Sequence, residues 1–295
     1  MYAQFFGTFL LSHNAVTKDQ LLNALSKKSS QHMKLGTLAI MKGYMTASEV
    51  DNVIISQTHN DCRFGDLAVR EGYLTQEQVD ELVKTQYPDF LLLGQTLVDE
   101  GYITNTQLET LIADYESENE LTDLDYSNEK QDDLNRILAN FFHTTDVAAD
   151  EYNASYMRLL LNDLTRFIGD DFTPLCFNSC KEYPVNYCVS QTINGDLSAK
   201  IYLDMPETTC ISFASRYVNE EFTEFDEYVQ ASLEDFLNLH NGLYNVNISN
   251  TLGKELTLEA PEVVSDELID LSDSSYLLQI MYPFGIVNFI FELKK

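Results

Sequence analysis

Asp235 and Asn238 are the residues of this chain whose types and spacing most directly suggest chemistry. They lie in residues 222–242, where apolar residues recur at helical spacing and predict an amphipathic helix. At about 100° per residue, an acid and a carboxamide three positions apart share the solvent side of that helix. The two side chains can therefore reach the same partner molecule. A pair of this kind is also frequent on exposed helices that have no special function.

The residues around this pair complete the candidate site. Glu234 is adjacent to Asp235 but turned by about 100° around the helix, so it is an imperfect substitute for that acid. Ala231 precedes Asp235 by about one turn, and Pro261 follows Asn238 after 22 intervening residues. We take Asn238, Asp235 and Glu234 as the candidate catalytic residues.

A second set of candidate residues lies near the amino terminus, in two segments of matching pattern. The set consists of Lys34, Leu35, Gly36 and Gln57 in the first segment and Arg63, Gly65 and Gln86 in the second. A glycine at a helix start lets backbone amides approach a phosphate, and the helix dipole favours its negative charge. An arginine can meet a guanine edge with two planar donors. The set predicts a nucleotide site, although the same residue types also occur where they only hold helices together.

Both segments belong to a pattern that occurs four times in residues 1–116. Its marker positions are 29 residues apart: Gly7, Gly36, Gly65 and Gly94, then Asn14, Gly43, Gly72 and Gly101, then Thr17, Thr46, Thr75 and Thr104. Each copy predicts a helix, a turn at the second marker, and a second helix that begins after the threonine. That threonine and the Gln or Glu three residues later form a capping box. A period of this length indicates an array of supersecondary units.

Strand patterns replace this period after about residue 145. Helices are expected over residues 152–167, 209–218 and 222–242, and strands over residues 172–178, 185–193, 196–205 and 255–264. Asn194-Gly195 predicts a hairpin turn, and residues 275–293 predict a second hairpin. Antiparallel strands with a few helices make an α+β domain.

An acidic stretch over residues 116–133 separates the two patterns and is typical of a solvated linker. It leads into a predicted helix over residues 132–142. The sequence thus predicts two domains. Residues 1–116 form an all-α domain of tandem helix-turn-helix repeats, residues 117–144 an acidic linker with a connecting helix, and residues 145–295 an α+β domain with an antiparallel sheet.

The formal net charge of −29 excludes several kinds of partner. A surface this acidic repels phosphate backbones and anionic lipids, so we expect no DNA, RNA or membrane partner. No apolar run is long enough to span a membrane, and the first residues lack a signal-peptide pattern, so we expect a cytoplasmic protein. The five cysteines are expected to be reduced, and Cys176 and Cys180 are too isolated from histidine to indicate a metal site.

The amino-terminal segments resemble the MshEN domain of secretion and pilus ATPases. That family pairs two motifs that run from Arg-Leu-Gly to a final Gln; here Lys34–Gln57 and Arg63–Gln86 each span 24 residues, with five residues between them. The resemblance implies that the residues of the second candidate set bind cyclic di-GMP. The chain departs from the motif where Lys34 replaces an arginine and Phe64 replaces a leucine.

Residues 150–295 resemble the CheC/CheX/FliY chemotaxis phosphatases. Asp235, Asn238 and Pro261 match the last three positions of that family's motif, with Asp235 in place of a glutamate and Ala231 in place of Asp or Ser. The resemblance implies a phosphorylated CheY-like response regulator as the partner, and it suggests a homodimer. It also implies that the asparagine orients the attacking water and that the acid pairs with a lysine of the partner. The partner brings its own Mg²⁺, so this chain has no cofactor of its own.

Two functions remain open. In the first, the chain is a phosphatase for a CheY-like response regulator and is regulated by cyclic di-GMP. In the second, it is a non-catalytic adaptor that binds a receiver domain or a secretion or pilus component, which Lys34, Ala231, Asp235 and the acidic surface favour. An unrelated enzyme has little support, because the histidines are scattered and no Gly-x-Ser-x-Gly motif is present. His240 falls on the apolar side of its helix and is expected to pack in the core.

Overall fold

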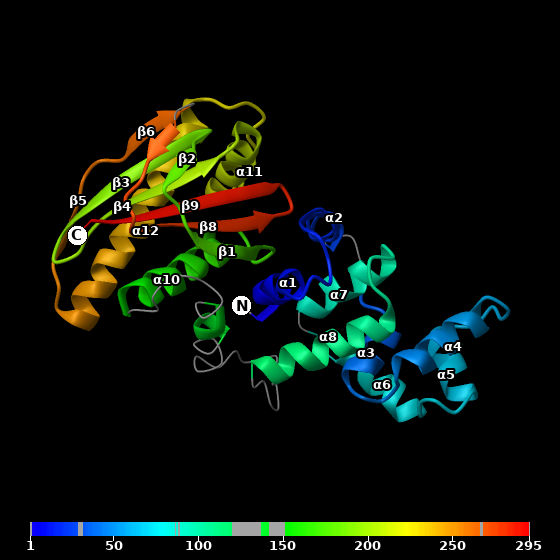
Figure 1. The fold of residues 1–295 in the computed structure, drawn as a ribbon. Coiled ribbons are helices and arrows are strands. Elements are labelled where there is room, and N and C mark those ends of the chain that lie inside the picture. The colour runs from blue at the N-terminus through cyan, green and yellow to red at the C-terminus, as the bar shows by residue number, and fades with distance from the viewer. Residues whose placement is uncertain are drawn as a thin grey trace. The chain divides into compact units, whose positions relative to one another are not determined.

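A computed structural model describes residues 2–28, 32–85, 87, 89–119, 137–141, 151–265 and 268–294. The chain divides into two compact units, Met1–Ile137 and Leu138–Lys295 (Figure 1). Each unit is considered by itself below. No helix in these ranges is long and apolar enough to cross a membrane.

The amino-terminal unit is helical wherever its secondary structure is regular, as predicted. Its helices are α1 (Tyr2–Ser12), α2 (Lys18–Lys28), α3 (Leu35–Met41), α4 (Ala47–Gln57), α5 (Phe64–Arg70), α6 (Gln76–Lys84), α7 (Asp89–Asp99) and α8 (Asn105–Glu118). Helix α8 continues through Glu116–Glu118, which the sequence had placed at the start of the acidic linker. The burial of Ile112 and Tyr115 on α8 explains why the helix extends this far. Most of the predicted linker, residues 120–136, lies outside the described residues.

The predicted turn and cap geometry occurs in every helix pair. The residues with positive φ are Asn14 (54°), Gly43 (66°), Gly72 (82°) and Gly101 (72°). Capping boxes with both of their hydrogen bonds present lie at the starts of α4 (Thr46), α6 (Thr75) and α8 (Thr104). Thr17 and Gln20 exchange the same two hydrogen bonds at the start of α2. Each cap satisfies backbone amides that the first helical turn leaves without a partner.

Close packing between these helices depends on their small residues. A Cβ atom added to Gly36 of α3 would lie 2.8 Å from Cγ1 of Val50 and 3.2 Å from Cζ of Phe64. Glycine therefore lets α3 pack directly against α4 and α5. A separate aromatic cluster of Phe6, Phe90 and Tyr115 fills the space between α1, α7 and α8.

The carboxy-terminal unit is an α+β domain with an antiparallel sheet, as predicted. Its elements are α10 (Glu151–Phe167), β1 (Thr173–Ser179), β2 (Glu182–Pro184), β3 (Tyr187–Gly195), β4 (Ser198–Met205), α11 (Glu207–Val218), α12 (Glu227–Leu252), β5 (Leu256–Leu258), β6 (Glu262–Ser265), β7 (Leu268–Asp270), β8 (Ser275–Tyr282) and β9 (Gly285–Lys294). Residues 137–141, at the boundary between the two units, are also helical. The remainder of the predicted connecting helix, residues 132–136 and 142, is not among the described residues.

Seven strands form the main sheet in the order β1-β8-β9-β4-β3-β5, with β6 also paired to β3. The two predicted hairpins are β3–β4, with Ile193 opposite Ala199, and β8–β9, with Tyr282 opposite Gly285. Helices α11 and α12 pack along one face of this sheet (Figure 1). On the other face, Tyr183 and Ile269 of the small β2–β7 ribbon pack against a cluster that includes Cys188 and Tyr202.

Helix α12 differs from its prediction at both ends. It begins at Glu227 rather than Phe222, because Oδ1 of Asp226 accepts hydrogen bonds from the backbone amides of Tyr228 and Val229 and so caps the helix. Phe225 therefore precedes the helix. Gly242 lies inside the helix, which ends at Gly253 in the left-handed conformation (φ 64°). Burial of Tyr244 and Ile248 carries the helix past Gly242.

The prediction of a single strand over residues 255–264 is wrong. This segment forms two short strands, β5 and β6, that pair with β3 at different places: Leu258 opposite Ile193, and Glu262 opposite Ser190. The break contains Pro261, which has no N–H group to donate to a strand ladder. The strands β2 and β7, of three residues each, were not predicted. Such short segments carry too little alternation to be recognised from sequence.

We expect Gly195→Ala to destabilise the carboxy-terminal unit much more than Gly253→Ala. Gly195 has φ 125°, and an added Cβ would clash with the backbone carbonyl oxygen of Glu255. Gly253 has φ 64° with open space around it. An alanine there would therefore have the cost of the left-handed backbone conformation but no steric clash. The free energy of unfolding, measured by urea denaturation, should fall by about 2 kcal/mol more for Gly195→Ala. Equal losses would show that the β3 turn tolerates a side chain.

Candidate functional site

Burial of one side of α12 decides which of its residues face solvent. Val229, Leu233, Phe236 and Leu237 are at most 1% exposed. Ala231, Asp235 and Asn238 lie on the opposite side and are exposed. The acid and the carboxamide thus project from the same solvent-facing side of one rigid helix.

A tyrosine from the neighbouring helix holds the Asp235 side chain. The hydroxyl group of Tyr217, near the end of α11, donates to Oδ2 of Asp235 at 2.6 Å. The Tyr217 ring packs edge-on against Phe236, with centroids 5.5 Å apart. Burial raises the pKa of Tyr217, and the hydrogen bond to Asp235 adds to that rise. The hydroxyl therefore stays protonated at neutral pH and remains a donor to the carboxylate.

A glutamine from the sheet holds the Asn238 side chain. Nε2 of Gln191, on β3, donates to Oδ1 of Asn238 at 2.8 Å. Gln191 is only 1% exposed, so this contact is made from inside the domain. Neither Gln191 nor Tyr217 was among the residues selected from sequence. Gln191 lies between Ser190 and Thr192 in the strand predicted over residues 185–193, and no sequence pattern distinguished it from them.

Glu234 has a different environment from Asp235. It is half-buried, whereas Asp235 is exposed. Burial raises the pKa of Tyr187, on β3, to about 12, and the charge of Glu234 contributes to that rise.

His240 packs in the core, as predicted, and does not join the exposed pair. Its side chain is 1% exposed, and its Nδ1 atom lies 2.6 Å from Oδ2 of Asp163 on α10. The ring of Tyr156 meets the imidazole edge-on, with centroids 4.7 Å apart. Burial lowers the pKa of His240, and the hydrogen bond to Asp163 offsets part of that effect.

The match to a known protein family covers this part of the chain. Residues 187–285 match the sequence model of the family described as "Chemotaxis phosphatase CheX". The carboxy-terminal unit contains a CheX-like domain. The matched segment is about a third of the chain, and it includes β3, α11, α12 and Pro261. No curated protein matches the chain.

Solved structures of chemotaxis proteins are similar to about half of the chain. A CheC-like superfamily protein from Shewanella sp. PV-4 is 17% identical, with a TM-score of 0.45, over 50% of this chain and 100% of its own. CheX from Desulfovibrio desulfuricans is 13% identical, with a TM-score of 0.43, over 49% and 100%. A CheX–CheY–BeF3–Mg²⁺ complex from Borrelia burgdorferi is 16% identical, with a TM-score of 0.41, over 49% and 99%.

Outside the CheX-like domain, part of the second candidate set surrounds a pocket of about 320 Å³ in the amino-terminal unit. Lys34, Leu35, Gly36 and Gln57 line this pocket, together with Phe64 and residues of α7 and α8. Arg63 and Gly65 are not among its lining residues. Arg63 is exposed at the start of α5, and Gly65 is buried close to Val79 and Leu35. Gln86 lies outside the described residues.

The charge of Lys34 is compensated inside this pocket. Its Nζ atom lies 2.5 Å from Oδ1 of Asp99 on α7. Gln95 donates to the same carboxylate oxygen at 2.9 Å, and Thr37 is hydrogen-bonded to Gln95. Lys34 and Asp99 are the charged residues of the pocket lining. The pocket therefore has a basic group, but its lining has no net positive charge.

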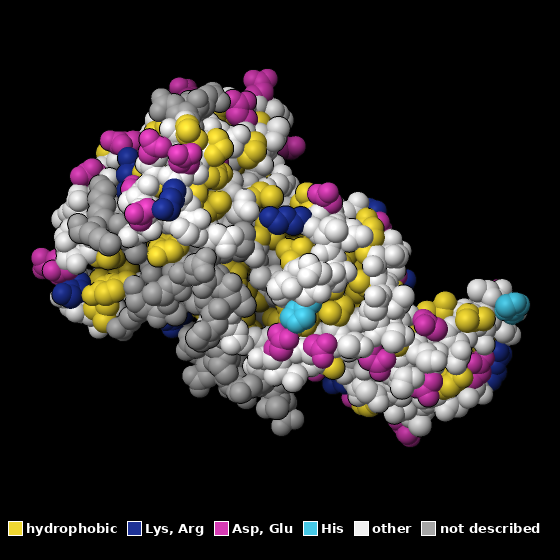
Figure 2. Space-filling view, in the orientation of Figure 1, with side chains coloured by type: hydrophobic (Ala, Val, Ile, Leu, Met, Phe, Trp, Pro, Cys, Tyr) yellow, Lys and Arg dark blue, Asp and Glu magenta, His cyan; other side chains and the backbone are white. Residues whose placement is uncertain are grey.

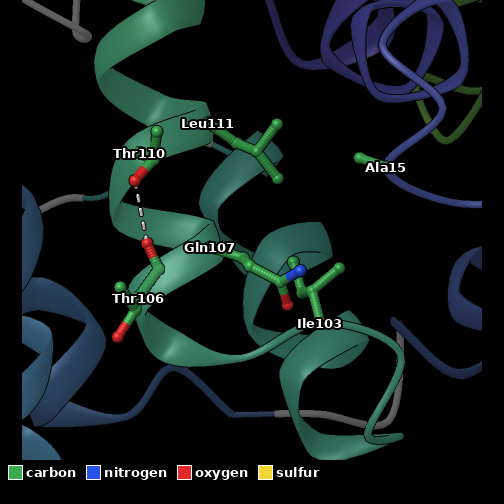
Figure 3. Close-up of a pocket in the computed structure, with 6 residues that line it drawn as sticks. All are labelled: Ala15, Ile103, Thr106, Gln107, Thr110 and Leu111. Carbon is green, nitrogen blue, oxygen red and sulfur yellow. Dashed lines mark hydrogen bonds between the residues drawn. The ribbon is translucent and has the colours of Figure 1, made fainter.

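A second, smaller pocket of about 260 Å³ lies beside α8 (Figure 3). It is lined by Ala15, Ile103, Thr106, Gln107, Thr110 and Leu111. The hydroxyl of Thr110 donates to the backbone carbonyl of Thr106 within the helix, and Gln107 accepts from the backbone amide of Thr104 in a capping box. These two hydrogen bonds are made within α8 and its cap, and the lining has no charged side chain. We assign no chemistry to this pocket.

We expect His240 to make the stability of the CheX-like domain depend on pH. Because burial lowers its pKa in the folded state, the unfolded chain takes up a proton first as pH falls below about 6.5. The free energy of unfolding should decrease from pH 7.5 to pH 5, with His240 contributing up to about 1.4 kcal/mol per pH unit. Urea denaturation at a series of pH values measures this dependence. In His240→Gln, the contribution of His240 to the pH dependence of the free energy of unfolding should be absent. The same slope in both proteins would contradict the assignment.

Proposed function

We propose that the CheX-like domain removes the phosphoryl group from a CheY-like response regulator. The observation that carries this proposal is the exposed pair Asp235 and Asn238 on α12, inside the segment that matches the chemotaxis phosphatase family. Each side chain of the pair is held by a donor from a neighbouring element, Tyr217 or Gln191. A prearranged acid and carboxamide are suited to a reaction in which catalysis consists mainly of positioning.

The proposed reaction is hydrolysis of an aspartyl phosphate on the partner. A water oxygen attacks the phosphorus atom, and the bond from phosphorus to the partner's carboxylate oxygen breaks. The aspartate leaves as a carboxylate, and inorganic phosphate is released. Asn238 orients the attacking water, as a glutamine does in other phosphoryl-transfer enzymes. The Mg²⁺ that neutralises the phosphoryl oxygens belongs to the partner.

Asp235 is proposed to pair with a lysine of the partner and so to align the two proteins. Its carboxylate is exposed on α12, and acidic side chains are spread over the visible surface (Figure 2). With a net charge of −29, the chain attracts a partner whose docking face carries basic residues. The proposed homodimer stays a prediction.

The adaptor function is the alternative for the same surface. Asp235 is one methylene shorter than the glutamate of the family motif, and Ala231 offers no polar group beside it. In this alternative, α12 docks on the receiver domain without reaching its phosphoryl group. Binding and hydrolysis therefore have to be measured separately.

We expect Asn238→Ala to remove most of the accelerated dephosphorylation. The receiver domain is phosphorylated with a small-molecule phosphodonor in the presence of Mg²⁺, and its loss of phosphate is followed with and without this protein. The wild-type protein should accelerate the loss, and Asn238→Ala should reduce the acceleration by about 100-fold, because the attacking water loses its orientation. The matched control is Asn250→Ala, an exposed asparagine of the same helix, which should behave as wild type.

The adaptor alternative predicts a different result in the same experiment. The protein would bind a receiver domain loaded with beryllofluoride, a stable mimic of the phosphoryl group, but would leave the rate of phosphate loss unchanged. Normal binding with no acceleration, for every receiver domain of the same organism, would overturn the phosphatase proposal.

A second proposed function is binding of cyclic di-GMP by the amino-terminal unit. The supporting observation is the pocket of about 320 Å³, in which Lys34 and Gly36 lie together with Gln57. Pockets of this size are within the range of small-ligand sites. In this proposal the ligand phosphate takes the place of the Asp99 carboxylate beside Lys34. Occupancy of the pocket would then regulate the phosphatase.

We expect Asp99→Asn to strengthen cyclic di-GMP binding and Lys34→Ala to weaken it. Removing the Asp99 charge frees Lys34 and ends the repulsion of the ligand phosphate, so the dissociation constant should fall by about tenfold at low salt. Isothermal titration calorimetry measures this constant. Asp114→Asn, at an exposed position of α8 that does not line the pocket, is the control. Absence of binding in the wild type and in both pocket variants would reject this pocket as the nucleotide site.

A further inference from the structure

We propose that Gln191 is a positioning residue for Asn238, and that the backbone carbonyl of Glu259 decides which edge of the Asn238 carboxamide faces the partner. This inference rests on the proposed phosphatase function and concerns the same site. It assigns a role to residues of β3, α10 and the β5–β6 connection that do not touch the partner themselves.

The residues form one continuous chain of hydrogen bonds. The hydroxyl of Tyr156, on α10, donates to Oδ1 of Asn241 at 2.7 Å. Nδ2 of Asn241 donates to Oε1 of Gln191 at 2.9 Å, and Nε2 of Gln191 donates to Oδ1 of Asn238 at 2.8 Å. Tyr156, Asn241 and Gln191 are at most 5% exposed, whereas Asn238 is exposed. This series of hydrogen bonds thus connects the core of the domain to its surface.

One acceptor fixes the direction of every bond in this chain. Nε2 of Gln191 also lies 2.8 Å from the backbone carbonyl oxygen of Glu259, and a carbonyl oxygen can only accept. Gln191 must therefore turn its NH₂ group toward Glu259 and Asn238. Its oxygen then requires the NH₂ group of Asn241, whose own oxygen requires the Tyr156 hydroxyl as donor. The orientation of three carboxamides follows from a single backbone group.

The Glu259 carbonyl is itself held in place. The backbone amide of Glu259 donates to the carbonyl oxygen of Thr192 on β3 at 3.0 Å, and its side chain accepts from Nδ2 of Asn194 at 2.8 Å. Two residues later, Pro261 restricts its own φ and keeps the preceding residue extended. The proline of the motif is thereby connected to the asparagine of the motif, through Glu259 and Gln191.

The consequence for Asn238 is a fixed presentation of its carboxamide. Its Oδ1 atom is anchored on the domain side, so the Nδ2 group is directed away from Gln191 and is available to a partner. The second lone pair of Oδ1 also remains available, because Gln191 occupies one lone pair. Fixing the rotation of this amide before the partner docks removes an entropy cost from the reaction step.

The test compares Gln191→Met, which has nearly the same size but no polar groups, with the wild-type protein. In the receiver-domain assay, kcat should fall by about 10- to 100-fold while KM changes by less than about twofold, since docking through Asp235 is unaffected. Tyr156→Phe should lower kcat in the same direction by a smaller factor, and it serves as the test if Gln191→Met does not fold. The control is Gln279→Met, since Gln279 donates to Asn288 at 3.0 Å within the same sheet but on the distant strand β8.

A measurement that does not depend on activity accompanies the assay. The side-chain NH₂ signal of Asn238 is assigned in ¹⁵N NMR spectra by its absence in Asn238→Ala, and its order parameter is measured in each variant. It should be ordered in the wild type and in Gln279→Met, and mobile in Gln191→Met. Unchanged order together with unchanged kcat would overturn the proposal, as would a loss confined to KM. If no receiver domain is dephosphorylated, the phosphatase proposal fails, and the order parameter alone decides whether Gln191 positions Asn238.

Discussion

The packing of α12 against the sheet is the constraint on which the rest of the CheX-like domain depends. Because Leu233, Phe236 and Leu237 must be buried, the opposite side of the helix has to face solvent. That side carries Asp235 and Asn238. The same packing brings the helix close enough to β3 for a buried glutamine to reach the exposed asparagine. The packing that forms the core therefore also positions the residues of the site.

Buried polar groups of this domain, on both faces of the sheet, hold neighbouring elements together. Asp204, on β4, is completely buried and accepts hydrogen bonds from the hydroxyl of Tyr183 at 2.9 Å and from the backbone amide of Asn186 at 2.7 Å. These bonds tie the β2 ribbon to the main sheet. Burial raises the pKa of Asp204, and the donors offset part of that rise. The buried pair of His240 on α12 and Asp163 on α10 likewise holds these two helices together. An unpaired polar group at such positions would be costly, so each specifies one arrangement of its elements.

In the amino-terminal unit, local turns and helix caps shape the structure. Its turns have Asn14 or a glycine at positive φ, and its caps pair a threonine with a Gln or a Glu. Glycines such as Gly36 let neighbouring helices approach closely. In the pocket around Lys34, α7 contributes Asp99 and Gln95 to the wall. The charge of Asp99 then determines how strongly Lys34 can attract an anion.

The sequence by itself determined the helical amino-terminal region, its caps and turns, the α+β class of the second unit, and the exposure of Asp235 and Asn238. These depend on residues close together in the chain, such as Thr46 with Glu49 or the apolar spacing of α12. Only the tertiary structure decided that α12 continues past Gly242 and that β5 and β6 pair with β3 at different places. It also decided that Tyr217 and Gln191 hold the exposed pair, and that Lys34 meets Asp99. Each of these depends on contacts between residues far apart in sequence, and a side chain such as Gln191 has no local pattern that reveals its partner.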